Sequence, residues 1–433
     1  MKYSLLILIA FLFSVNTAES QSINFRFNNY FYGWERLDSL SDNSSAKTMH
    51  LRGYQNYLLE FNTGKWSFNT MAQTEEDVVN KVDKGFNYRF YNLYVKGSNL
   101  FNLLDVKLGR QSLFAGAGIG TIDGMYFKIK AGQNKEYQFA GYGGIPTAYS
   151  YEFEKYTKLE NNYHFGAQFT YYGVKDLMAS ISYSNKKRTP EPYTTIRLDS
   201  IFNPTVREIT FDGPAEQLAG IDLNYTYLGV HNFYSKVNFD IQAKKLYKAD
   251  FNVRVQLMDK LRAFGEYDYR EPHYTYNSIF WVFNFSKYQE VSGGLDYTLD
   301  NGINIYGKAG AVLYENDNSV KINAGFTHPN FGLSFIKYFG YAGESDGVFG
   351  FYQRNFEDNL FSTSASLSYA RYKLGNVYEG TERVNSFSGM LGFTYRPLPQ
   401  FSVDTQGQFI VNRIYQSDVR FLVGFNYWMF KKF

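Results

Sequence analysis

Arg110, Gln111 and Asp123 are the residues whose types and spacing could do chemistry. They flank Ser112–Ile122, a run of small, uncharged residues that is rich in glycine. A guanidinium binds carboxylates through two parallel hydrogen bonds, so Arg110 could bind either Asp123 or an anionic ligand group. The period of the flanking strands puts Arg110 and Asp123 on the outward parity. That parity favours an Arg110–Asp123 pair, unless a bulge at Gly109 turns Arg110 inward.

Further charged side chains are predicted to share the inward face of their strands. They are Lys107, Lys128, Lys130, Arg254, Arg262, Glu266, Asp268 and Arg270. The last four belong to one strand face, so we expect them to neutralise one another in part. Basic residues slightly outnumber acidic residues at inward positions, which weakly favours anionic solutes if these side chains line a passage. A wet interior laced with structural ion pairs is the alternative interpretation.

No catalytic or metal-ligating pattern accompanies these residues. The five histidines are scattered without metal-ligand spacing. The chain has no cysteine, which excludes disulfides, thiolate ligands and covalently attached haem. It contains no nucleophile elbow or P-loop, and its net charge of +3 argues against nucleic-acid binding. We therefore expect neither enzymatic activity nor a cofactor.

The elements that must position these residues are strands, because hydrophobicity alternates with a period of two along most of the chain. Between positions 163 and 171, the odd residues are Tyr, Phe, Ala, Phe and Tyr, whereas the even residues are polar or small. The same alternation recurs at 221–227, 233–242, 251–257, 361–369 and 401–411. The aromatic content of 20% suits strands, and particularly strands with one apolar and one wet face.

Turn residues divide the strands at regular intervals. Ten tight connections are predicted, at Asn62–Gly64, Gly97–Asn99, Gly132–Asn134, Gly173–Asp176, Leu228–His231, Asp259–Lys260, Asp300–Gly302, Pro329–Asn330, Asp358–Asn359 and Pro397–Pro399. Longer and more polar connections lie between them, the longest at Lys186–Pro214. Alternation of short turns with long loops is typical of outer-membrane barrels. Ten tight turns and closure of the chain ends would give 22 strands, within an expected range of 18 to 22.

The first twenty residues form a predicted signal peptide rather than part of the fold. Lys2 is followed by the apolar run Leu5–Val15, and Ala18–Ser20 provides a small-x-small cleavage site. The run is too short for a membrane-spanning helix, which needs about 20 apolar residues. The mature chain, 21–433, is expected to be one all-β, transmembrane antiparallel β-barrel with an inward glycine-rich loop near 112–122. Many of its predicted strands reach the 9–11 residues of a tilted span.

The end of the chain supports a membrane location. The outward positions of the last strand are Phe421, Val423, Phe425, Tyr427 and Met429, and the chain ends at Phe433 on the same parity. This ending resembles the C-terminal signature of bacterial outer-membrane proteins, apart from Lys431 at a position that is usually apolar. The resemblance implies recognition of the terminal strand by the barrel-assembly machinery.

The stretch Gly109–Gly124 carries a second resemblance. Its Gly-Arg-Gln…Asp-Gly hairpin resembles one in porin-like barrels of the alginate-export and related substrate-specific porin families. It is also similar to barrels that sheath multihaem cytochromes. The porin resemblance implies a constriction with Arg110 close to the pore.

Taken with the resemblance, these patterns predict a porin-like channel in the outer membrane of a diderm bacterium. Small polar solutes would cross it by passive or substrate-selective diffusion, and its outward face would contact outer-membrane lipid. One alternative is a sheath for a periplasmic cytochrome, in which all the haem would belong to the partner. The other alternative is a soluble, secreted carbohydrate-binding β protein that uses exposed tyrosines.

Overall fold

The fold was analysed in a computed structural model. It describes residues 21–38, 48–83, 85–148, 150–153, 159–189, 192–210, 215–271, 287–315, 318–340, 344–373 and 383–433. The predicted signal peptide at 1–20 lies outside the described residues. Apart from a 3-10 turn at Glu357–Asn359, the described regular elements are all strands, as the sequence predicted. None of the described residues form a helix long and apolar enough to cross a membrane.

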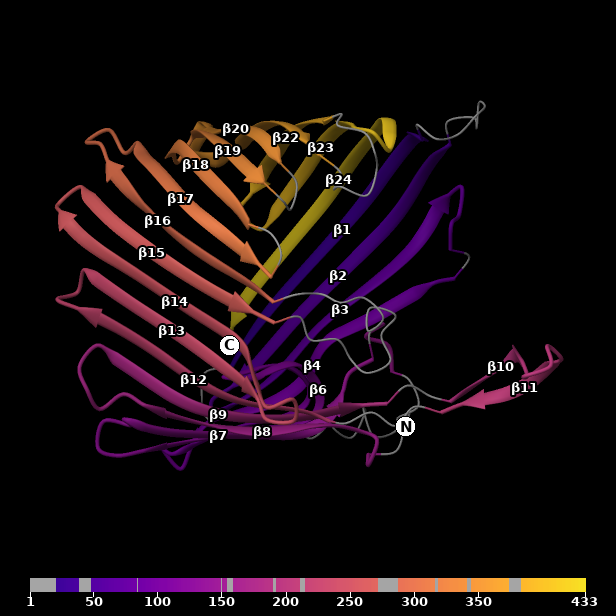
Figure 1. Cartoon of the computed structure of the whole chain (residues 1–433), viewed down its shortest axis with the longest axis vertical. Helices are drawn as coiled ribbons and strands as arrows, with labels where there is room; N and C mark the ends of the chain where they lie inside the picture. The colour runs from indigo at the N-terminus through magenta and orange to yellow at the C-terminus, as the bar shows by residue number, and fades with distance from the viewer. Residues whose placement is uncertain are drawn as a thin grey trace.

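The strands follow one another along the chain with few long interruptions (Figure 1). The first nine are β1 Gln21–Asp38, β2 Met49–Thr63, β3 Trp66–Val79, β4 Asn87–Leu100, β5 Leu104–Ala115, β6 Gly118–Ala131, β7 Tyr137–Pro146, β8 Asn162–Tyr171 and β9 Leu177–Arg188. A short pair follows, β10 Tyr193–Leu198 and β11 Pro204–Ile209. The next eight are β12 Glu216–Tyr227, β13 His231–Asp240, β14 Lys245–Met258, β15 Leu261–Arg270, β16 Tyr288–Thr298, β17 Asn304–Tyr314, β18 Asn318–His328 and β19 Phe331–Gly340. The last five are β20 Ser345–Phe356, β21 Phe361–Tyr372, β22 Val384–Leu398, β23 Phe401–Val411 and β24 Tyr415–Lys432.

The described strands other than β10 and β11 form one closed, antiparallel sheet of 22 strands. Each pairs with the next along the chain, β9 pairs with β12, and β24 pairs with β1 over a register that runs from Ser22↔Lys432 to Asp38↔Tyr415. In Figure 1 the first strand, in indigo, accordingly lies beside the last, in yellow. Closure removes the unpaired edges that an open sheet would expose. The predicted barrel and the upper end of its predicted strand range are confirmed.

All ten predicted tight turns connect neighbouring strands at one end of the barrel, where Gln21 and Phe433 also lie. One of them is displaced from its predicted position. β4 continues past Gly97–Asn99 to Leu100, and the turn lies at 101–103. The register shifts between Gly97 and Leu100, and Asn99 already has a positive φ of 50°. The asparagine and glycine that suggested a turn therefore mark an irregular strand end.

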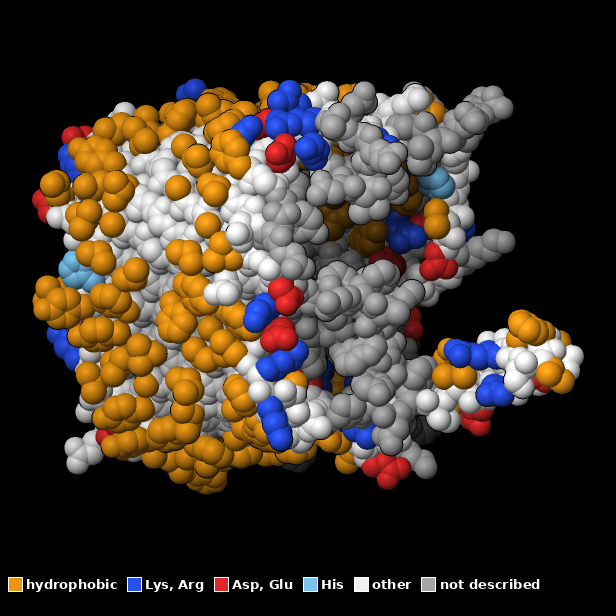
Figure 2. Space-filling model, viewed as in Figure 1, with side chains coloured by type: hydrophobic (Ala, Val, Ile, Leu, Met, Phe, Trp, Pro, Cys, Tyr) orange, Lys and Arg blue, Asp and Glu red, His pale blue; other side chains and the backbone are white. Residues whose placement is uncertain are grey.

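The two faces of the wall differ as the alternation predicted. Odd positions of β1 and β2, such as Phe25 and Leu59, are direct partners on the apolar face, whereas Asn28 and Asn56 are partners on the other. Figure 2 shows hydrophobic side chains spread over the outside of the wall, with charged side chains at the two ends. An apolar exterior band and a polar interior are what a barrel needs when lipid surrounds it and water fills it.

The long connection at Lys186–Pro214 is not merely a polar loop. It contains β10 and β11, which pair with each other from Tyr193↔Ile209 to Leu198↔Pro204 and project away from the barrel (Figure 1). The sequence predicted only a loop here, because the proline and polar residues of this segment are typical of loops and its alternation of hydrophobic residues is short.

Candidate functional site

The β5–β6 hairpin leaves the wall of the barrel part-way along its length. β5 and β6 pair continuously from Leu104↔Ile129 to Ala115↔Gly118. β4, however, pairs with β5 only as far as Leu93↔Arg110, and β7 pairs with β6 only as far as Pro146↔Ile122. Both neighbouring strands therefore stop pairing near Arg110 and Ile122. The rest of the hairpin, from these residues to its tip, has no strand of the wall paired beside it.

The tip of this hairpin lies against the inner face of distant strands. The backbone N–H of Ala117 donates to Oγ of Ser182 on β9 at 2.9 Å. Nζ of Lys236 on β13 donates to the carbonyl of Gly116 at 3.0 Å. Ser182 and Lys236 occupy the polar face, because their strand neighbours Ile181 and Val237 belong to the opposite, apolar face. The tip thus crosses to the part of the inner wall that β9, β12 and β13 form.

Small residues allow the hairpin to lie close to that wall. Gly116 has a φ of 62°, which side chains rarely adopt, and a Cβ there would overlap Ser182. A Cβ on Gly118 would overlap the hydroxyl of Tyr142. Leu113 and Ile122 are buried together with Tyr142, so the underside of the hairpin is an apolar contact between hairpin and wall. The glycine-rich composition is therefore explained by close packing.

The other face of the hairpin is open. Phe114 is 80% exposed and Ile119 is 54% exposed, and the two are direct cross-strand partners. Because Leu113, Ala115 and Ile122 cover the wall, the Phe114–Ile119 face looks toward the remaining interior of the barrel.

Arg110 and Asp123 form an ion pair at the base of the hairpin. Nε and Nη2 of Arg110 donate to the two carboxylate oxygens of Asp123 at 2.7 and 2.8 Å. Nη1 donates to the carbonyls of Phe90 and Tyr151 at 3.2 and 2.6 Å, and the ring of Phe153 covers the guanidinium at 4.4 Å. The Arg110 side chain is thus enclosed, and the carboxylate that it binds belongs to this chain rather than to a ligand. Arg110 is 3% exposed, so the guanidinium is not open to a solute.

Gln111 is similarly enclosed. It is 1% exposed, and its amide lies near the carbonyls of Lys107, Gly109 and Gly124 at 3.3 to 3.5 Å. This amide therefore contacts the backbone where the hairpin bends.

Lysines form a patch on the inner wall below the hairpin. Lys96 on β4 and Lys107 on β5 are direct cross-strand partners, and Lys128 on β6 lies one pair further on. Nζ of Lys107 lies between the rings of Tyr94 and Tyr126, at 5.4 and 5.5 Å from their centres. The carboxylate of Asp105 lies 2.5 Å from Nζ of Lys130. Like charges placed directly opposite one another destabilise a sheet, so this patch favours a negatively charged neighbour.

The inward face of β15 carries charges of both signs. Arg262 pairs with Asp296 on β16 at 2.7 Å, and Glu266 pairs with Lys308 on β17. Asp268 is flanked by Asp250 on β14 and Glu290 on β16, and these two carboxylates pair with Lys248 and Lys321. Arg270 lies at the end of the strand, and Arg254 is exposed on β14. This region forms an ion-pair ladder, and it is separate from the lysine patch.

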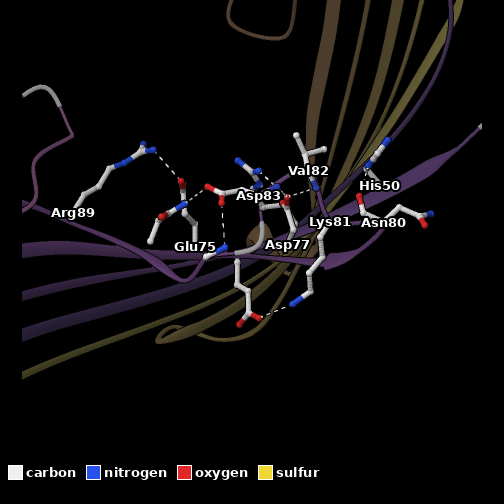
Figure 3. Close-up of polar contacts among 12 residues, drawn as sticks. His50, Glu75, Asp77, Asn80, Lys81, Val82, Asp83 and Arg89 are labelled. Atoms are coloured by element: carbon white, nitrogen blue, oxygen red, sulfur yellow. Dashed lines mark hydrogen bonds and ion pairs between the residues drawn. The ribbon is translucent and has the colours of Figure 1, made fainter. Parts of the chain in front are cut away.

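A polar cluster braces the loop end of β2, β3 and β4 (Figure 3). The carboxylate of Asp77 pairs with Arg52 and accepts the backbone N–H groups of Val82 and Asp83 at 2.8 and 2.7 Å. In the loop itself, a hydrogen bond from the amide of Asn87 lowers the pKa of the Asp83 carboxyl. These bonds fix the rim, and the described residues contain no group of three or more histidine or acidic side chains that could hold a metal ion.

Two parts of the site had no sequence signal. One is the surface formed by Ser182 and Lys236, which the hairpin tip contacts. Serine and lysine are common on any strand face that meets water, so their presence gives no signal of this contact. The other is the segment Tyr151–Phe153, which contacts Arg110. It also accepts a hydrogen bond from β4, because the N–H of Phe90 donates to the carbonyl of Tyr151 at 3.0 Å. Both depend on contacts between residues far apart in the chain.

No protein family and no protein with a curated description matches this sequence. The structure is similar to several solved structures. They include the translocation pore of the P pilus usher PapC, with 8% identity, a TM-score of 0.47 and coverage of 94% of this chain and 99% of that one. OccAB1 of Acinetobacter baumannii has 8% identity, a TM-score of 0.41 and coverage of 95% and 96%. OccK2 of Pseudomonas aeruginosa, solved with glucuronate, has 7% identity, a TM-score of 0.42 and coverage of 94% and 98%. This chain has the architecture of a closed, antiparallel β-barrel of 22 strands.

Proposed function

We propose that this protein is an outer-membrane channel through which small polar solutes diffuse. The observation that carries the proposal is the β5–β6 hairpin, whose tip contacts Ser182 and Lys236 on the inner wall. A hairpin that folds inward and lies against the wall narrows the interior without filling it, and its exposed Phe114 and Ile119 would form part of the narrowed surface. The apolar exterior suits a membrane position and disfavours the soluble alternative.

The lysine patch gives the channel a preference for anions. Lys96, Lys107 and Lys128 lie together on the inner wall. In the ion-pair ladder, by contrast, each described carboxylate of β14 to β16 other than Asp268 has a basic partner. Basic side chains that line a pore lower the barrier for anions. The candidates Arg110, Gln111 and Asp123 would act on the channel indirectly, by holding the hairpin in place.

The hairpin also weighs against a cytochrome sheath. A sheath needs its interior free for the inserted partner, and the tip at Gly116 and Ala117 occupies part of that space. No feature of the described residues favours the sheath in return, and diffusion of small solutes needs no partner.

Single-channel conductance in planar bilayers tests the proposal. Replacing Leu113–Gly120 by an Asn-Gly turn, which leaves the pair Ser112↔Thr121 to close the hairpin, should raise the conductance. The matched control removes Tyr193–Ile209, the projecting hairpin β10–β11, and should leave the conductance unchanged. The proposal is overturned if the purified barrel conducts no ions, and its constriction is overturned if the two deletions have equal effects.

A further inference from the structure

A row of aromatic rings follows the inward face of β1. Tyr30, Tyr32 and Trp34 occupy alternate positions on the face that is opposite to Phe27 and Phe31. The rings of Tyr32 and Trp34 are stacked with centres 5.4 Å apart, and Trp34 stacks on His50 of β2 at 5.0 Å. Tyr30 has Tyr54 of β2 as its cross-strand partner. The rings are half-buried, so part of each faces the interior.

Trp428 of β24 extends this row toward the turn end of the barrel. It is the cross-strand partner of Arg26, whose guanidinium lies 5.3 Å from the centre of the indole, and it is 47% exposed. From position 26 to position 34, the strand covers about 26 Å at about 3.3 Å per residue. We call Tyr30, Tyr32, Trp34, His50, Tyr54 and Trp428 the aromatic track.

Hydrogen-bonding groups accompany the track. Asn28 lies between Asn56 on β2 and Asn426 on β24, so three inward amides form a row between Trp428 and Tyr30. The Tyr30 hydroxyl donates to Oδ1 of Asn426 at 2.8 Å, and Nε1 of Trp428 donates to Oδ1 of Asn24 at 3.0 Å. These bonds hold the rings in fixed orientations along the wall.

The end of the track at the rim is also fixed. Nδ1 of His50 donates to the carbonyl of Asn80 at 2.6 Å, in the cluster that Figure 3 shows. The arginines at the rim end of the track bind carboxylates, because Arg52 pairs with Asp77, and Arg36 and Arg420 share the buried Asp418. The track itself is thus aromatic and hydrogen-bonding. It also lies clear of the hairpin tip, since β13 is nine strands round the wall from β2.

We propose that the aromatic track binds the flat faces of pyranose rings, so that the solutes of this channel include uncharged oligosaccharides. This inference rests on the proposed channel function and names a solute class for it. A half-exposed ring in a wet interior presents an apolar face, and the C–H face of a pyranose covers that face without losing its hydroxyl contacts. The amides of Asn24, Asn28 and Asn56 supply donors and acceptors for those hydroxyls. Lipid contact cannot explain the rings, because they lie on the polar face.

The test is block of the ion current by maltotriose and by cellotriose, with sorbitol as a control solute that has no rigid ring face. Trisaccharide should reduce the current in a saturable manner, and sorbitol should not. Trp34→Leu and Tyr32→Leu should each raise the half-blocking concentration roughly fivefold to tenfold, from the loss of one stacking contact. Phe31→Leu, an outward ring of the same strand, should leave it unchanged.

A second measurement separates failure of the track from failure of the channel. Tryptophan fluorescence of the detergent-solubilised protein should shift on addition of maltotriose, and Trp34→Phe should reduce the shift. A barrel that conducts but shows neither block nor shift overturns the track and leaves the channel standing. A barrel that does not conduct but gives the Trp34-dependent shift supports the track and overturns the channel. Equal half-blocking concentrations for Trp34→Leu and Phe31→Leu also overturn the track.

Discussion

Arg110 and Asp123 are direct cross-strand partners, and their two-pronged ion pair lies where the β5–β6 hairpin leaves the wall. The same guanidinium binds carbonyls of Phe90 on β4 and of Tyr151 in the segment after β7. One side chain therefore fastens the base of the hairpin to two neighbouring parts of the barrel. This arrangement assigns Arg110 a positioning role, and it explains why a charged pair on the outward parity is enclosed.

Loss of this pair should destabilise the barrel strongly. Asp123→Asn leaves the buried guanidinium without a counter-charge, and breaking a buried pair costs on the order of 3 kcal/mol. The temperature at which the folded, fast-migrating band converts on a gel should fall. The control is Asp300→Asn, because Asp300 pairs with Lys260 at an exposed turn where such pairs contribute about 0–1 kcal/mol. Similar falls for the two variants would contradict the role of Arg110.

The contact between the hairpin tip and the wall should depend on the absence of a side chain at Gly116. Gly116→Ala places a methyl group against Ser182, so the tip should detach and the channel current should fluctuate between levels. Gly229→Ala is the control for backbone strain, because Gly229 has a similar positive φ of 71° with open space around it. Single-channel recordings of the two variants distinguish loss of the contact from strain alone. Steady currents in Gly116→Ala would show that the contact does not hold the hairpin.

Ion selectivity should follow the lysine patch. Changing Lys96, Lys107 and Lys128 together to Gln removes three positive charges from the inner wall, so permeability should move from anions toward cations. The reversal potential across a potassium chloride gradient measures this change. Lys431→Gln removes a charge at an outward position, paired with Ile23, and should have no effect. An unchanged reversal potential in the triple variant would show that the lysine patch does not set the ion selectivity.

The sequence by itself determined the closed barrel and limited its strand number to between 18 and 22. A period of two assigns every residue of a strand to one of two faces, and turn residues mark where the chain reverses, so both features can be read locally. Alternation likewise assigns Phe31 to the outward face and Trp34 to the inward face before any contact is known, although both are aromatic. The ion pair of Arg110 and Asp123 was also within reach, since the two residues close one hairpin.

Only the tertiary structure decided what the inward residues contact. Alternation states that Ser182, Lys236 and Trp428 face the interior, but it cannot state that a hairpin 65 residues away binds Ser182. It also cannot show that Trp428 joins β1 across the closure of the barrel. The physical reason is that curvature and closure bring distant strands together, and a local pattern contains no information on which strands meet.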